Sequence, residues 1–436
     1  MIKKEQLELF IDFFKENITK EENFKIGAEF EHFLVKKDSL KALSYYEKNG
    51  IEDILKRLVQ NGWKPKYEDQ NLIGCTKYGS EISLEPGAQF ELSVKPQESI
   101  ILLEQLYLDI IGEIISICDD IDCYLVPMGY HPKTKIDEIP WVPKKRYDIM
   151  SEYLGKRGKL AHNMMKGTSS LQVAVDYNSE EDFANKMRVA YILGPFLSYL
   201  FDNSIYFEDE KYNKNMLRTR IWNNCDDDRC GIVPGVFDED FGFEKYARYV
   251  LNQPPIFYID KEGNEHPFNK PLYKVLKSTW NKKQIKHSLS MCFPHVRARE
   301  FIEIRMADAL YYPLNMAYIT LINNIFYNEK MIDYILNKFA GIDFNTLKKL
   351  EKRIIKKGKK AEYKGENIYN ILVDIYDRAL RGSKKDEKRC LSQIKELIEL
   401  RTNPKKKFKN CCDSKRKIVK YQSLNNYQRC QKCINQ

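Results

Sequence analysis

The stretch Ile82–Ser93, ISLEPGAQFELS, constrains the fold of this chain more than any other. It contains two extended runs separated by a Pro-Gly pair, which favours a sharp turn. Side chains on a strand alternate between the two faces of a sheet, so Gln89, Glu91 and Ser93 share one face. Acidic residues are poor strand formers, and Glu85 and Glu91 therefore need a specific reason to be here.

Three other segments repeat this pattern of one apolar and one polar face. One such strand is ordinary, because an antiparallel sheet often has one solvated face. Solvated faces usually carry Lys, Thr and Ser, so Glu combined with Gln and Arg favours a shared polar site, with plain solvent exposure as the alternative. The residues that share a polar face in the three segments are Glu29 and Glu31, then Ser170, Gln172 and Asp176, then Glu303 and Arg305.

The expected helices and strands follow one another irregularly and do not alternate. Apolar spacing predicts helices over residues 5–18, 51–60, 96–118, 144–154, 183–201 and 244–251, and strands over 124–128 and His287–Met291. From residue 310 to 400 the pattern is helical throughout. This order predicts an α+β fold with an antiparallel sheet, followed by a helical C-terminal region. We expect a catalytic domain over residues 1–400 and a basic, cysteine-containing, flexible tail over residues 401–436.

The net charge of +10 comes almost entirely from the last residues of the chain. Residues 404–436 contain ten Lys or Arg and one acid, Asp413, which leaves the rest of the chain close to neutral. The chain therefore lacks the overall basic character of a nucleic-acid-binding protein, and only the tail is a candidate for such contacts. The first thirty residues have no apolar core, and acids interrupt the longest apolar stretch, 100–117. We expect no export signal, no membrane span, reduced thiols and a cytoplasmic location.

Several glutamates on one sheet face repel each other, and their pKa values rise unless cations join them. Oxygen ligands select hard cations, and Mg²⁺ takes a few carboxylates together with substrate phosphates. Arg305 would face the same cluster and neutralise phosphate charge during transfer. The chain has no G-x-G-x-x-G or Walker A sequence, so carboxylate-bound metal would have to hold any nucleotide. The residues alone therefore indicate an enzyme that handles Mg²⁺ and phosphate, without naming its substrate.

Five segments, taken in order, resemble the plant and proteobacterial type of glutamate–cysteine ligase, which is related in fold to glutamine synthetase. They are GAEFEHF, ISLEPGAQFELS, GTSSLQVAVD, RTRIWNNCDDDRCGIVPGVF and FIEIRMAD, and they span roughly residues 20–310. The resemblance implies an antiparallel sheet curved into a funnel and flanked by helices, with the substrates and Mg²⁺ on its concave face. It also implies the ATP-dependent first step of glutathione-type thiol synthesis. The γ-carboxylate of L-glutamate is phosphorylated, and the amine of L-cysteine then displaces the phosphate to form an amide.

The resemblance also assigns roles to single residues. It makes Arg218 the bidentate clamp for the glutamate carboxylate and Arg305 the residue that neutralises the transferring phosphate. The implied Mg²⁺ ligands are Glu29, Glu31, Glu85, Glu91 and Glu303. The implied substrate contacts are Gln172 and Thr168 at the glutamate or nucleotide site, and Trp222, Tyr130 and Arg220 on the side of the amine substrate.

Alternative functions remain at this point. One is a ligase that joins glutamate to a different amine, and another, with less support, is a Mg²⁺-dependent phosphohydrolase. A third is a non-enzymatic protein that binds its partner through the basic tail. For a ligase, we expect removal of residues 404–436 to leave turnover intact, whereas a protein that binds through its tail should lose its partner.

The tail itself has three interpretations. It is a disordered basic segment, an attachment site for RNA or an acidic surface, or part of a zinc site. Adjacent cysteines fit the usual ligand spacing of zinc poorly. The four cysteines of such a site would be Cys411, Cys412, Cys430 and Cys433.

Overall fold

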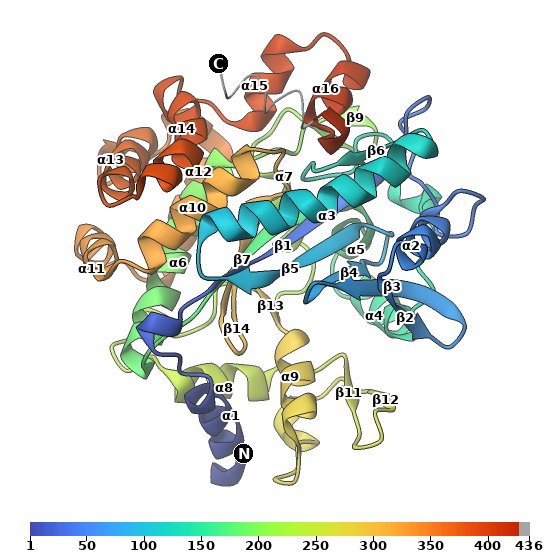
Figure 1. The fold of residues 1–436 in the computed structure, drawn as a ribbon. Helices are drawn as coiled ribbons and strands as arrows, with labels where there is room; N and C mark the ends of the chain where they lie inside the picture. The colour runs from blue at the N-terminus through green and yellow to red at the C-terminus, as the bar shows by residue number, and fades with distance from the viewer. Residues whose placement is uncertain (427–436) are drawn as a thin grey trace.

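A nine-stranded sheet lies at the centre of the computed structural model, which describes residues 1–426 (Figure 1). Its strands follow one another in the order β14–β15–β7–β1–β5–β4–β3–β2, and β6 pairs with β1. All of these pairings are antiparallel, as predicted from the order of the elements. The strands are β1 (Ile26–Lys36), β2 (Lys64–Glu68), β3 (Asn71–Lys77), β4 (Ser80–Leu84), β5 (Phe90–Gln97), β6 (Cys123–Val126), β7 (Ser170–Val175), β14 (Val296–Ala298) and β15 (Ile302–Asp308).

The pairing of β1 with its two neighbours decides which polar residues come together. Glu31 lies directly opposite Glu91 of β5. Glu29 lies opposite Ser93 of β5 on one side and Gln172 of β7 on the other. Because side chains alternate along each strand, all five point to the same face of the sheet. The polar face predicted from four separate segments is thus continuous across β1, β5 and β7.

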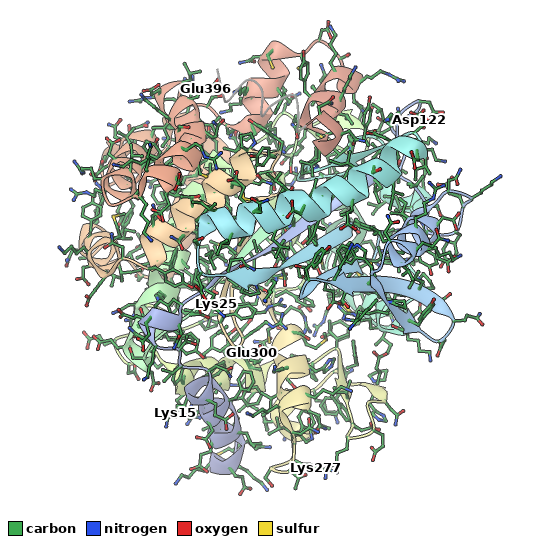
Figure 2. All side chains as sticks on the ribbon, viewed as in Figure 1. Lys15, Lys25, Asp122, Lys277, Glu300 and Glu396 are labelled. Atoms are coloured by element: carbon green, nitrogen blue, oxygen red, sulfur yellow. The ribbon has the colours of Figure 1, made fainter. Side chains whose placement is uncertain are left out.

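Helices cover both faces of the sheet. The long helices α3 (Ile100–Asp120) and α10 (Leu314–Phe326) lie across the apolar face (Figure 1), where the ring centroids of Tyr107 and Phe30 are 4.2 Å apart. Over the polar face stand α4 (Lys145–Gly155), α5 (Ala161–Gly167), α7 (Leu217–Trp222) and α9 (Lys282–Ser290). Charged residues such as Lys15, Asp122, Lys277 and Glu396 lie at the periphery of the molecule (Figure 2).

The remaining elements surround this core. The other helices are α1 (Lys4–Glu16), α2 (Ile51–Gln60), α6 (Glu180–Leu200), α8 (Phe243–Asn252), α11 (Glu329–Lys338), α12 (Phe344–Lys357), α13 (Ile368–Arg381), α14 (Lys385–Glu399), α15 (Pro404–Cys411) and α16 (Lys415–Gln422). Short two-stranded ladders join β8 (Tyr206–Phe207) to β9 (Glu210–Lys211), β10 (Cys230–Gly231) to β13 (Phe293–Pro294), β11 (Phe257–Ile259) to β12 (Glu265–Pro267), and β16 (Glu362–Tyr363) to β17 (Glu366–Asn367). Among residues 1–426 we find no helix with the length and apolarity that a bilayer crossing requires.

One predicted strand is wrong. The segment predicted as the strand His287–Met291 belongs almost entirely to helix α9. The helix begins at a capping box, in which Asn281 accepts the backbone N–H of Gln284 and the Gln284 side chain accepts the backbone N–H of Asn281. The short apolar run near its end resembles a strand only when this upstream cap is overlooked.

The prediction of a flexible tail is wrong for the part that the structure describes. Most of residues 404–422 belong to α15 and α16, and Phe408, Ile418 and Val419 are buried in a hydrophobic cluster with Phe33 of β1 and Val126 of β6. These three apolar side chains recur among lysines, so the overall composition hides an amphipathic pattern. The proposed zinc site stays untested, because Cys430 and Cys433 lie outside the described residues. The Sγ atoms of Cys411 and Cys412 are 3.6 Å apart.

Candidate active site

A cavity of about 550 Å³ opens on the polar face of the sheet. Its floor comes from β1, β3, β4, β5 and β7, and its walls come from α4, α5, α7 and α9. The structure therefore gathers, in one place, most of the polar residues that the sequence pattern put on one face. The predicted site residues that line this cavity are Glu29, Glu31, Glu85, Glu91, Thr168, Gln172, Arg218, Trp222 and Arg305.

Burial and mutual repulsion raise the pKa values of two carboxylates in this cavity. Burial and the charge of Glu303 raise the pKa of Glu29 from 4.5 to about 7. Burial and the charges of Glu29, Glu85 and Glu31 raise the pKa of Glu91 well above its ordinary value. A group of carboxylates in this condition takes up protons or a cation to relieve the repulsion.

A chain of hydrogen bonds orients Glu31 before any ligand binds. Its carboxylate accepts the backbone N–H and the hydroxyl of Ser170 at 3.0 and 2.6 Å, and the amide N–H of Gln172 at 3.0 Å. The amide oxygen of Gln172 in turn accepts a hydrogen bond from Arg305. Glu31, Gln172 and Arg305 are therefore fixed relative to one another by strands β1, β7 and β15.

Glu303 lies behind the cavity wall and is paired with arginines. It accepts hydrogen bonds from Arg297 at 2.8 and 3.2 Å and from Arg305 at 2.6 Å. Burial raises the pKa of Glu303, but the charges of Arg297 and Arg305 outweigh burial and hold this pKa well below its ordinary value. The structure therefore does not support Glu303 as a metal ligand. Its observed role is to hold two arginines, one of which is Arg305, at the cavity.

Arg218 is a buried arginine with almost no protein partner. The residue is 5% exposed, and its one hydrogen bond among residues 1–426 runs to the backbone oxygen of Arg305 at 3.4 Å. Trp222 follows four residues later in α7 and so lies on the same face of the helix, with its ring centroid 5.1 Å from the Arg218 guanidinium carbon. A buried guanidinium with so few acceptors suits a ligand carboxylate, which accepts two of its N–H groups at once.

The cavity also carries cations that the sequence analysis did not select. Burial and the charge of Arg146 lower the pKa of Lys144 to about 8, although Glu85 and Glu91 act in the opposite direction. The run of basic residues at the start of the predicted helix 144–154 was a visible signal for Lys144 and Arg146. Lys286 was missed because its surroundings were interpreted as a strand. The additional lining cations are Lys66, Lys144, Arg146, Lys286, Arg297 and Arg299.

Comparison with known proteins identifies the family. A family model described as glutamate-cysteine ligase family 2 matches residues 25–413, which is most of the chain. The chain belongs to this family. Its relatives include glutamate–cysteine ligase B, chloroplastic, of Oryza sativa subsp. japonica, 28% identical over 418 residues that cover 90% of this chain and 81% of that protein. The chloroplastic glutamate–cysteine ligase of Nicotiana tabacum is 28% identical over 402 residues that cover 89% and 76%.

A solved structure gives the same result for the fold. The crystal structure of glutamate–cysteine ligase from Francisella tularensis in complex with AMP matches with a TM-score of 0.59 and 12% sequence identity. The match covers 92% of this chain and 87% of that one. At this identity it shows the fold alone, and it confirms the fold class that the sequence resemblance implied.

Two substrate contacts predicted from the resemblance are not supported by the structure of this ligase-family chain. Arg220 is exposed and does not line the cavity, because residues two apart on helix α7 point in different directions. Tyr130 is fully buried outside the cavity, where its hydroxyl contacts Glu208 and Asn163. Its backbone bridges to Thr168, so its observed role is to support a residue that does line the cavity.

The cavity residues fit a hard divalent cation in chemistry, without forming a complete cage for it. Glu29, Glu31, Glu85 and Glu91 offer only oxygen ligands, which is the donor set that Mg²⁺ prefers. Within residues 1–426, however, no group of three or more His, Cys, Asp or Glu side chains is arranged to hold a metal ion. This is consistent with Mg²⁺, which typically takes one or two carboxylates and completes its shell with water and substrate phosphates.

The raised pKa of Glu29 predicts how stability depends on pH. The folded-state pKa of about 7 lies above the unfolded value of 4.5, so the folded protein binds more protons between these values. The free energy of unfolding of the ligand-free protein should therefore fall as the pH rises through this window. Thermal melts from pH 5 to 8 measure this slope, and Glu29→Gln should reduce it because that variant has no carboxyl to titrate. Identical slopes in the two proteins would contradict the assignment.

Proposed function

We propose that this cavity carries out the reaction of the family, the ATP-dependent joining of glutamate to cysteine, with Arg218 as the residue that binds the carboxylate of glutamate. The observation that carries this proposal is the buried guanidinium of Arg218, which faces the cavity with one long hydrogen bond to protein. Trp222 supports it, because its indole N–H is buried without a hydrogen-bond partner among the described residues. A bound amino acid would supply acceptors for both groups.

In this proposal the carboxylates bind the metal ion and the cations bind the phosphates of ATP. Glu29, Glu31, Glu85 and Glu91 would hold Mg²⁺, which when bound neutralises phosphate charge. Lys144 and Arg146 line the same cavity and would contact the phosphates of ATP. No glycine-rich loop is needed in this arrangement, because paired cations and metal-bound carboxylates replace the backbone N–H groups of such a loop.

The proposed reaction has two steps. First, a γ-carboxylate oxygen of glutamate attacks the γ-phosphorus of ATP, which forms γ-glutamyl phosphate and releases ADP. Arg305, held by Glu303 and Gln172, stabilises the charge on the phosphoryl group in transit. The amine nitrogen of cysteine then attacks the carbonyl carbon of the γ-glutamyl phosphate, the bond from that carbon to the phosphate oxygen breaks, and the nitrogen loses a proton. The products are the amide and inorganic phosphate.

An acceptor screen tests this proposal directly. Purified protein with ATP, Mg²⁺ and glutamate should release phosphate only when an amine is added, and mass spectrometry should show γ-glutamylcysteine when that amine is cysteine. Serine is the matched acceptor, because it differs from cysteine only in carrying oxygen in place of sulfur. If another amine gives a product and cysteine gives none, the proposed glutamate and ATP sites are retained and cysteine is the wrong acceptor. Phosphate release without glutamate would instead support the phosphohydrolase.

A cytoplasmic location stays a proposal. It is supported by the cysteines of residues 1–426, all of which are free thiols. The curated relatives named above are described as chloroplastic.

A further inference from the structure

The C-terminal helices pack against the segment that leads to Arg218. In Figure 1 they lie beside β9 at the top of the molecule. At the start of α15, the Asn403 side chain donates to the backbone oxygen of Tyr199 at 3.0 Å, and the backbone N–H of Lys405 donates to the backbone oxygen of Asp202 at 3.0 Å. The first turn of α15 thus caps the C-terminal end of α6 and places Lys405 inside the protein.

Lys405 and Asp202 form an ion pair that is almost completely buried. The side chain of Lys405 is 4% exposed and that of Asp202 is 0% exposed, with 3.7 Å between Nζ and Oδ2. The Lys405 ammonium also donates to the backbone oxygen of Lys214 and lies 4.3 Å from the ring centroid of Tyr212. Lysine is rarely buried to this degree unless it is paired, and removing one member of such a pair leaves an uncompensated charge.

Asp202 connects this lysine to helix α7. Its Oδ2 atom, the one nearest Lys405, accepts the backbone N–H of Met216 at 2.8 Å. Met216 has the left-handed conformation φ 54°, ψ 57°, which is unfavourable for a side chain of its kind and needs support from its surroundings. Helix α7 begins at the next residue, and Arg218 follows immediately. The carboxylate of Asp202 therefore fixes the entry into the helix that aims Arg218 at the cavity.

We propose that Lys405 is a positioning residue for Arg218, acting through the buried carboxylate of Asp202 and the left-handed residue Met216. This inference rests on the proposed function, in which Arg218 binds glutamate. It reverses the sequence expectation that turnover does not depend on residues 404–436. The C-terminal segment is part of the glutamate site because Lys405 supplies the charge that holds the Asp202 carboxylate in place.

A second contact ties the same segment to the same region. Gln422 of α16 and Asn203 exchange two side-chain hydrogen bonds, at 2.9 and 3.0 Å, and both residues are fully buried. The backbone N–H of Asn203 donates at 2.7 Å to Asp308, whose charge acts on Arg218. Both helices of the tail thus contact the segment Asp202–Asn203, whose hydrogen bonds run to Met216 and Asp308.

Lys405→Met in the full-length protein tests the proposal. Met keeps most of the apolar volume and removes the charge. We expect the KM for glutamate to rise about tenfold or more, with the KM for ATP unchanged, because Arg218 is displaced while the phosphate-binding residues are not. Lys407→Met is the matched control: Lys407 lies two residues further on in α15, is more exposed, and pairs with Glu396 at the surface. A lower kcat with an unchanged KM for glutamate would reduce Lys405 to a stabilising residue and overturn the proposal.

A pair of double variants keeps the test decisive if Lys405→Met does not fold. Asp202→Asn with Lys405→Met retains an acceptor for Met216, whereas Asp202→Leu with Lys405→Met does not, and neither buries a charge at this pair. The KM for glutamate should be normal in the first and raised in the second, and equal values would overturn the proposal.

Arg218→Lys separates this inference from the function on which it rests. A raised KM for glutamate in Arg218→Lys, together with a normal KM in Lys405→Met, overturns the positioning role alone. A normal KM for glutamate in Arg218→Lys overturns both the role of Arg218 and the positioning role of Lys405.

Discussion

Glu91→Gln is expected to fold normally and to lose nearly all ATP-dependent ligation. Gln is nearly isosteric with Glu, so β5 should keep its pairing with β1 and β4, and the amide oxygen can accept the hydrogen bond that Ser83 donates to Glu91 at 2.8 Å. The variant loses one of the four carboxylates that would hold Mg²⁺, an ion that tolerates poor ligand geometry badly. Because phosphoryl transfer depends mainly on positioning and charge neutralisation, we expect the rate to fall by about 10²-fold or more.

Thermal melts beside the ligation assay separate lost binding from lost folding. Without ligands, Glu91→Gln should melt at or above the temperature of the wild type, because burial and the neighbouring glutamates raise the pKa of Glu91 and oppose its charge. With Mg²⁺ and ATP, the wild type should gain stability and the variant should gain little. Glu98→Gln is the matched control, since Glu98 is exposed just beyond the end of β5. Wild-type turnover in Glu91→Gln would contradict the proposal that the cavity carboxylates hold Mg²⁺ for the reaction.

The sequence predicted the centre of the site well because strand periodicity is a local property. Alternation alone placed Glu29, Glu31, Glu91 and Gln172 on polar faces, and the structure adds only the register that brings the strands side by side. A register shift of one residue would have turned all of these carboxylates into the core. The alternation and the apolar partners opposite them therefore carried real information about the site.

Some features of the cavity and of the tail could not be predicted from the sequence. They depend on contacts between distant segments, or on a helix where the sequence pattern also fits a strand. Arg297 becomes the partner of Glu303 only when β14 folds back on β15. Arg218 and Arg220 would share a face on a strand, but α7 is helical, and only Arg218 reaches the cavity. The tail was interpreted from its charge, whereas its packing depends on a buried lysine, Lys405, whose partner lies two hundred residues earlier in the sequence.

Arg218→Lys is expected to raise the KM for glutamate about 10- to 100-fold and to leave the KM for ATP nearly unchanged. Lys keeps the positive charge, so the electrostatic balance with Glu31 and Asp308 is retained. It loses the planar fork that matches both oxygens of a carboxylate, and its shorter reach leaves one of them without a donor. The ring of Trp222 would also lose one of its two guanidinium contacts, that of Arg218 at 5.1 Å, and would keep that of Arg305 at 5.7 Å.

Arg220→Lys is the matched control, because it makes the same chemical change on the same helix at an exposed position. Its KM for glutamate should equal that of the wild type. An equal rise in both variants would mean that the change disturbs helix α7 and not a bound carboxylate. A normal KM in Arg218→Lys would show that the near absence of protein acceptors around this buried guanidinium has another cause. A rise confined to Arg218→Lys would assign the glutamate carboxylate to the one arginine of α7 that faces the carboxylate-lined cavity.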